Sequence, residues 1–135
     1  MQSLPQLDLA TNEFFSLHWP ESWGQAPGWS SRWDMQTGIL NPKLPGTYAL
    51  SNASGTLLYV GKGSQKADAG IARRLLNHVV RPIKSRGPYV LVDNWSTRGV
   101  DTIHTLGFLP AHAYMIPALE SFLIDRLKPK YNVRL

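Results

Sequence analysis

The sequence contains three sets of polar side chains whose types and spacing suit chemistry on an anion. Arg74 and His78 are four positions apart in a stretch with helical apolar periodicity, so they lie one turn apart at the edge of its apolar face. Tyr48 and Tyr59 lie in two consecutive strand-like segments, and Glu120 lies in a second helical stretch. An arginine can bind an anion, tyrosine and histidine can move protons, and a carboxylate can hold a cation.

Glu120 is the least expected of these residues, because helical periodicity places it inside an apolar stripe. On a helical wheel it falls between Leu127 and Ile124. A bare buried carboxylate is costly, so it must be paired, protonated or bound to a cation. One interpretation is an ion pair with Arg74 or Lys128, or a solvated edge of the stripe. The other is a ligand of Mg²⁺ or Mn²⁺, which keep several waters when one or two carboxylates bind them.

The two tyrosines belong to a predicted β-hairpin. Strand-like residues 46–51 and 56–61 flank the turn-forming residues 52–55. The simplest register places Tyr48 directly opposite Tyr59 on one face of the ribbon. An ordinary cross-strand aromatic pair explains this pattern as well as a chemical role does, so both interpretations stay open at this point.

The remaining elements follow from apolar periodicity and from the positions of proline. We expect a helix over residues 67–80 that ends at Pro82, and a second helix over residues 117–127. The apolar run at residues 89–92 indicates a third, largely buried strand. For residues 93–108 we expect a loop with a short helix.

Residues 1–45 show little regular pattern, apart from a short helix expected over residues 12–18. A proline-flanked hinge at residues 41–45 separates this segment from the rest of the chain. The segment carries four tryptophans: Trp19, Trp23, Trp29 and Trp33. Because tryptophan is highly buried on average, we expect the segment to pack on the core. A base-stacking surface and a dimer contact are the alternatives.

Charge is unevenly distributed along the chain, which has 135 residues and a formal net charge of +5. Residues 1–60 carry two basic and four acidic side chains, whereas residues 61–135 carry twelve basic and five acidic ones. The surplus in the second half suits a polyanion such as nucleic acid.

Composition also excludes several classes of protein. The chain has no cysteine, which excludes disulfides, zinc–thiolate sites and a thiol nucleophile, and which is consistent with a cytoplasmic location. No apolar run is long enough to span a membrane, and residues 1–10 lack the pattern of a secretory signal.

The candidate residues fall within five short motifs: Gly46-Thr47-Tyr48, Tyr59-Val60-Gly61, Arg74 with His78, Glu120, and Leu127-Lys128-Pro129-Lys130-Tyr131-Asn132. In this order they resemble the motifs of the GIY-YIG nuclease superfamily. The closing motif is similar to the corresponding segment in the nuclease domain of the bacterial excision-repair incision subunit. The resemblance covers residues 46–132.

This resemblance implies an α/β (α+β) fold with a small three-stranded antiparallel sheet flanked by helices. It implies a GIY-YIG-like nuclease domain over residues 46–135, with residues 1–45 as an N-terminal extension that packs on it. The implied activity is that of an endonuclease, which hydrolyses a DNA phosphodiester with the help of a single Mg²⁺ or Mn²⁺.

The resemblance also implies roles for individual residues. Tyr59 would activate or position the attacking water, and Tyr48 would support that water or the phosphate. Arg74 would bind the scissile phosphate, and His78 would relay a proton or hold a tyrosine hydroxyl. The interval from Tyr59 to Arg74 is longer than in the repair branch, which leaves Arg73 as the alternative catalytic arginine. The spacing to His78 favours Arg74.

In the same scheme Glu120 would hold the metal ion and Asn132 would brace the site. Four basic side chains are expected to contact the substrate: Lys62, Lys66, Arg73 and Arg81. Lys62 matches a basic position that is common in the repair branch, and Lys66 belongs to an enlarged loop.

The expected partner is DNA, with RNA left open, and no membrane is involved. A homodimer would be a natural way to cut both strands. Two hypotheses from other classes remain beside the nuclease. One is a catalytically silent nucleic-acid-binding module with the same fold, and the other is a domain that contacts proteins through its tryptophan-rich segment.

Overall fold

The computed structural model describes residues 3–30, 33, 35, 44–63, 70–83 and 88–132. They form a mixed α+β fold around a three-stranded antiparallel sheet with strand order β2-β1-β5. The strands are β1 (Gly46–Ser51), β2 (Leu57–Lys62) and β5 (Thr102–Gly107). The predicted fold class is therefore confirmed.

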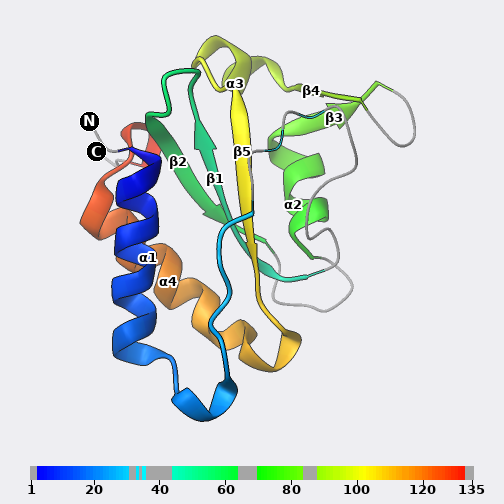
Figure 1. The fold of residues 1–135 in the computed structure, drawn as a ribbon. Coiled ribbons are helices and arrows are strands. Elements are labelled where there is room, and N and C mark those ends of the chain that lie inside the picture. The colour runs from blue at the N-terminus through cyan, green and yellow to red at the C-terminus, as the bar shows by residue number, and fades with distance from the viewer. Residues whose placement is uncertain are drawn as a thin grey trace.

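The helices surround this sheet (Figure 1). They are α1 (Leu4–His18), α2 (Gly70–His78), the short α3 (Asp93–Thr97) and α4 (Ile116–Leu127), with 3-10 helices η1 (Glu21–Trp23), η2 (Pro110–Met115) and η3 (Lys130–Asn132). A separate two-stranded ribbon pairs β3 (Val80–Pro82) with β4 (Tyr89–Leu91). None of the helices found in the described ranges is long and apolar enough to cross a membrane.

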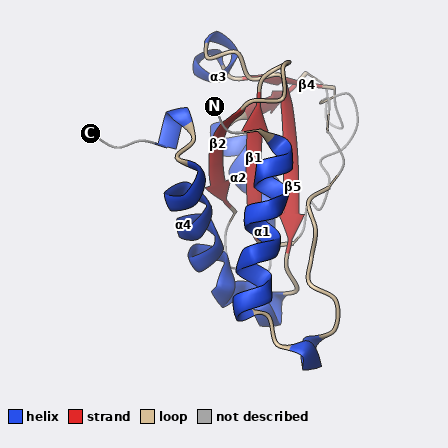
Figure 2. Cartoon of the chain, turned by 60° about the vertical axis from the view of Figure 1, so that its left-hand side comes forward, coloured by secondary structure: helices blue, strands red, loops and turns tan. Residues whose placement is uncertain are grey.

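The sheet separates two hydrophobic clusters because successive side chains of a strand point to opposite faces. Ala49 packs in the cluster that contains the buried residues of α1 and α4, whereas its neighbours Tyr48 and Leu50 pack in the cluster of α2. Figure 2 shows the same layering, with α1 and α4 in front of the sheet and α2 behind it.

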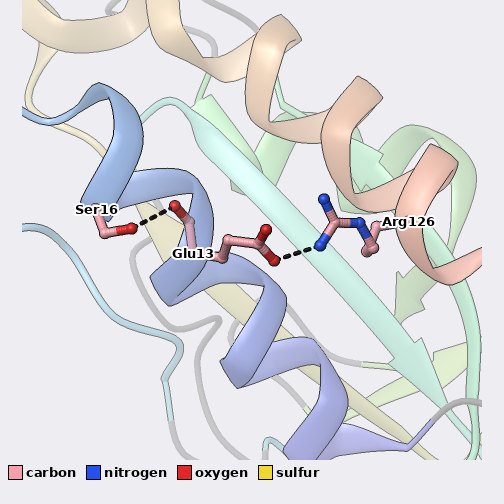
Figure 3. A network of polar contacts seen from close by, with 3 residues as sticks. All are labelled: Glu13, Ser16 and Arg126. Atoms are coloured by element: carbon pink, nitrogen blue, oxygen red, sulfur yellow. Dashed lines mark hydrogen bonds and ion pairs between the residues drawn. The ribbon is translucent and has the colours of Figure 1, made fainter.

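Helix α1 is longer than the sequence pattern predicted, because it begins at Leu4 and not near residue 12. The Gln6 side chain accepts a hydrogen bond from the backbone N–H of Ser3 at 2.8 Å, which satisfies a donor at the start of the helix. An ion pair between Glu13 and Arg126 joins α1 to α4 (Figure 3).

The third strand of the sheet was predicted in the wrong place. Residues 89–91 form a strand, but it pairs with β3 and lies outside the main sheet. The third strand is β5, within the stretch expected to be a loop with a short helix; α3 is that helix. Strand β5 carries buried polar side chains whose partners come from distant segments, and a local apolar pattern does not reveal it. Thr102, for example, shares a 2.6 Å hydrogen bond with Ser51.

The hairpin forms as predicted, but its register differs by two residues. Tyr48 pairs with Gly61, and Tyr59 pairs with Leu50. A shift of two residues keeps every side chain on its face, so both tyrosines still lie on one side of the sheet. A β-bulge between Leu50 and Ser51 accompanies the shift.

The two predicted helices are present with small changes at their ends. Helix α2 ends at His78, and Val80 already belongs to β3, so Pro82 lies in a strand and does not end the helix. Helix α4 ends at Leu127, and Lys128 takes a left-handed conformation with φ 45°. The division of the chain at residue 45 stays a prediction, and most of the expected hinge lies outside the described residues.

Candidate active site at the edge of strand β2

Tyr48 and Tyr59 are diagonal neighbours on the α2 face of the sheet. Their ring centroids are 6.1 Å apart. Tyr48 is 1% exposed and lies against Gly61, whose missing side chain leaves room for the phenol ring. Tyr59 is half-buried, and its other neighbour is the Trp95 ring at 4.9 Å. One tyrosine is thus enclosed and the other reaches the surface.

Arg74 connects Tyr48 to His78. Its guanidinium donates to His78 Nε2 at 2.7 Å and also hydrogen-bonds the Tyr48 hydroxyl. Since arginine has only donors, His78 Nε2 is the acceptor in this hydrogen bond. The i,i+4 spacing seen in the sequence therefore produces a direct contact, and Arg74 is the arginine that makes it.

Burial raises the pKa of Tyr48 well above its ordinary value, and the neighbouring Tyr59 raises it further. The hydrogen bond and the charge of Arg74 lower it by less. Tyr48 therefore keeps its proton at neutral pH and can donate a hydrogen bond, but it cannot act as a base.

A pocket of about 590 Å³ opens beside β2, which is an edge strand of the sheet. Its described lining combines three of the predicted residues with neighbours on or just after α4: Tyr59, Glu120, Ser121, Ile124, Asp125, Lys128 and Asn132. Glu120 has a side chain that is 20% exposed, with Lys62 Nζ at 3.9 Å. The carboxylate is partly solvated and has a cation nearby.

Asn132 ties the closing motif to the strand that carries Tyr59. Its Oδ1 accepts from the Val60 N–H at 2.7 Å, and its Nδ2 donates to the Val60 carbonyl at 2.8 Å. The amide side chain thus pairs with β2 as a peptide group would. This contact fixes the backbone next to Tyr59 while Asn132 lines the pocket.

The four predicted substrate-binding residues differ in where they lie relative to this pocket. Lys62 is exposed beside Glu120. Arg73 on α2 and Arg81 on β3 are exposed, and neither is among the described residues of the pocket lining. Lys66 lies outside the described residues.

Sequence reasoning missed several residues around the pocket. Asp125 lines it one turn beyond Ser121, so helical spacing along α4 could have found it. Lys128, named from the sequence only as a possible ion-pair partner of Glu120 and as part of the closing motif, also lies in the lining. Trp95 had no such signal, because its contact with Tyr59 joins segments that are distant in the sequence. Its indole Nε1 also donates to the His78 carbonyl at 2.9 Å.

Glu120 is the pocket residue to consider for a mostly hydrated divalent cation. The described residues contain no group of three or more His, Cys, Asp or Glu side chains that could enclose a metal. Mg²⁺, however, is often bound through one or two carboxylates while it keeps several waters. Glu120, partly exposed in the lining of an open pocket, is the predicted residue that could supply such a carboxylate.

Comparison with known proteins gives one similarity. The chain is 34% identical over 99 residues to the UvrABC system protein C of Chlorobaculum tepidum. The match covers 70% of this chain and 13% of that relative, so the chain corresponds to a small part of it. No family model and no solved structure matches the chain.

Proposed function

We propose that the protein is a metal-dependent endonuclease of the GIY-YIG type that hydrolyses DNA phosphodiester bonds. The observation that carries this proposal is the convergence of Tyr59, Glu120 and Asn132 on one pocket, with Arg74 and His78 linked to it through Tyr48. The similarity to a UvrABC system protein C supports a nuclease-related role. The basic second half of the sequence is consistent with a polyanionic substrate.

In this proposal Tyr59 positions and activates the attacking water, because it is the tyrosine that reaches the pocket. Arg74 binds the scissile phosphate and stabilises the charge that grows on it in the transition state. Tyr48, held protonated by burial, donates a hydrogen bond to that water or to the phosphate. His78 holds the guanidinium in place by accepting at Nε2.

Glu120 would hold the cation from α4, and Asp125 lies in the same lining. When bound, Mg²⁺ or Mn²⁺ supplies positive charge to the phosphate oxygens. Lys62, whose Nζ is 3.9 Å from Glu120 Oε1, would stay near the carboxylate and would contact the DNA. Asn132 keeps the backbone of β2 in place beside Tyr59.

The test is cleavage of supercoiled plasmid by the intact chain with Mg²⁺ or Mn²⁺, with EDTA as the metal-free arm. We expect Glu120→Gln and Tyr59→Phe to lower the cleavage rate by about 100-fold or more. Glu21→Gln and Tyr114→Phe are matched controls, because both residues are exposed and lie outside the pocket lining. Equal cutting by the wild type, Glu120→Gln and Tyr59→Phe would contradict the proposal.

A silent nucleic-acid-binding module is the second candidate, favoured by the proximity of Lys62 to Glu120. An ion pair of this kind could occupy the carboxylate in place of a metal. This candidate predicts salt-sensitive DNA binding without metal-dependent cleavage. Binding without cleavage in Mg²⁺ and in Mn²⁺ would therefore assign this function in place of the nuclease.

A further inference from the structure

Arg98 is an exposed residue that follows α3 and lies over two aromatic rings. Its guanidinium carbon is 4.8 Å from the centroid of Trp95 and 4.7 Å from the centroid of Tyr131. The two rings are nearly perpendicular, at 84°. Contact with both ring faces restrains the long side chain, so the guanidinium has already lost much of the freedom that binding would remove.

Among the described residues, no acidic side chain is paired with the positive charge of Arg98. Within the described part of the chain, its side chain forms no ion pair and no hydrogen bond. Arg126 is the instructive contrast, since it also lies over a ring, that of Phe122 at 4.8 Å, but is paired with Glu13. The guanidinium carbon of Arg98 lies over both rings, and a guanidinium carries its N–H donors around the edge of its plane.

The aromatic pair under Arg98 adjoins two residues that line the pocket, Tyr59 and Asn132. Trp95 is 7% exposed, contacts the Tyr59 ring at 4.9 Å and donates to the His78 carbonyl. Tyr131 directly precedes Asn132, which lines the pocket. A second cation, Lys130 Nζ, lies 5.2 Å from the centroid of the same Tyr131 ring. Two basic side chains thus lie over the aromatic pair next to Tyr59.

We propose that Arg98, with Lys130 beside it, binds a backbone phosphate of the nucleic acid strand next to the phosphate held in the pocket. This proposal rests on the proposed function and adds a substrate-positioning site to it. Arg98 lies over Trp95, and Trp95 contacts Tyr59 in the pocket lining. A strand with one phosphate in the pocket would therefore bring a neighbouring phosphate near a guanidinium that has no acceptor among the described residues. Arginine is suited to phosphate because its planar fork can donate two parallel hydrogen bonds.

The proposal is tested by measuring the affinity of a labelled DNA duplex as a function of salt, in EDTA so that no cleavage occurs. We expect Arg98→Ala to bind about three- to tenfold more weakly at 0.1 M salt and to reduce the slope of log K against log salt by about 1. Arg98→Lys keeps the charge and should retain the slope. In cleavage assays Arg98→Ala should raise KM and leave kcat nearly unchanged.

Arg126→Ala is the matched control, because it removes an exposed, ring-stacked arginine that is committed to Glu13. Its salt slope should equal that of the wild type. If Arg98 only packs against the rings, Arg98→Ala will lower the melting temperature without changing the slope, which overturns the proposal. Should Arg98→Ala fail to fold, Arg98→Gln decides in the same way.

The two proposals fail in different ways. Wild-type protein that neither binds nor cleaves DNA contradicts both. Wild-type cleavage together with an unchanged salt slope in Arg98→Ala contradicts only the role of Arg98.

Discussion

The phenol ring of Tyr48 occupies the space that a side chain at Gly61 would need. A Cβ added at Gly61 would clash with Tyr48 Cζ and would lie 2.5 Å from the Tyr48 hydroxyl oxygen. The two residues are directly paired across β1 and β2. The glycine of one motif thus makes room for the tyrosine of the other, which explains in steric terms why both motifs occur together.

Gly61→Ala should destabilise the protein by about 1–3 kcal/mol, because the enclosed Tyr48 ring cannot move aside without disturbing the core. Urea unfolding measures this change. Gly28→Ala is the control, since an added Cβ there meets nothing within 4 Å. Equal free energies of unfolding for the two variants would show that the ring has room to shift.

The stability contributed by Tyr48 should fall at alkaline pH. Its pKa is raised in the folded state, so above about pH 10 the unfolded chain loses this proton while the folded protein keeps it. The free energy of unfolding should then drop by roughly 1.4 kcal/mol per pH unit from this group, and the contribution is fully present below pH 10. Urea unfolding from pH 8 to 11 measures the free energy of unfolding of the wild type and of Tyr48→Phe. The wild-type value should fall relative to that of the variant as the pH rises above about 10. A constant difference over that range would contradict the prediction.

Asn132→Ala should lower the free energy of unfolding by about 1–3 kcal/mol, because it leaves the N–H and the carbonyl of Val60 without their side-chain partner. Hydrogen exchange checks this directly, since the Val60 amide should exchange faster in the variant. Asn94→Ala, at an exposed position on α3, is the control. Unchanged protection of Val60 in Asn132→Ala would show that the amide contact contributes nothing to holding β2.

The ion pair between Glu13 and Arg126 should contribute only about 0.2–1 kcal/mol, because both side chains are nearly half exposed and water screens their charges. A double-mutant cycle with Glu13→Gln and Arg126→Ala measures this coupling. The coupling should shrink as salt is raised. A coupling of several kcal/mol that persists in high salt would contradict the prediction and would make Arg126→Ala a poor control.

The elements predicted well are those whose signal is local. In α2, Ile71 and Leu75 are fully buried as the periodicity requires, and Arg74 contacts His78. The faces of the hairpin were also predicted correctly, although its register was not. Alternation fixes which face a side chain takes, whereas the bulge at Leu50 that sets the register leaves no clear mark in the sequence.

The start of α1 could have been predicted. Ser3 and Gln6 form the two ends of a capping-box pattern, and Pro5 lies in the first turn, where proline is tolerated.

Strand β5 was missed because its burial depends on partners far away in the sequence. Its buried Thr105 is hydrogen-bonded by the backbone and hydroxyl of Ser30, and Ile103 pairs with Trp33. These hydrogen bonds satisfy polar groups of β5 that are buried in the sheet. In the sequence alone, where the distant partners are not visible, the same polar residues predict a loop. The contact of Trp95 with Tyr59 escaped prediction for the same reason, whereas Glu120 was found because a carboxylate within an apolar stripe is a local anomaly.

Asn132 has a consequence for the exposed edge of the sheet. An edge strand with unpaired N–H and carbonyl groups is a template on which another chain can add a strand. At Val60 the amide of Asn132 occupies both groups, and Ser3 forms a bridge with Thr56 at the beginning of the same edge. The outer edge of β2 is therefore blocked against strand addition at Val60, beside the pocket, and the residue just before β2 is covered by Ser3.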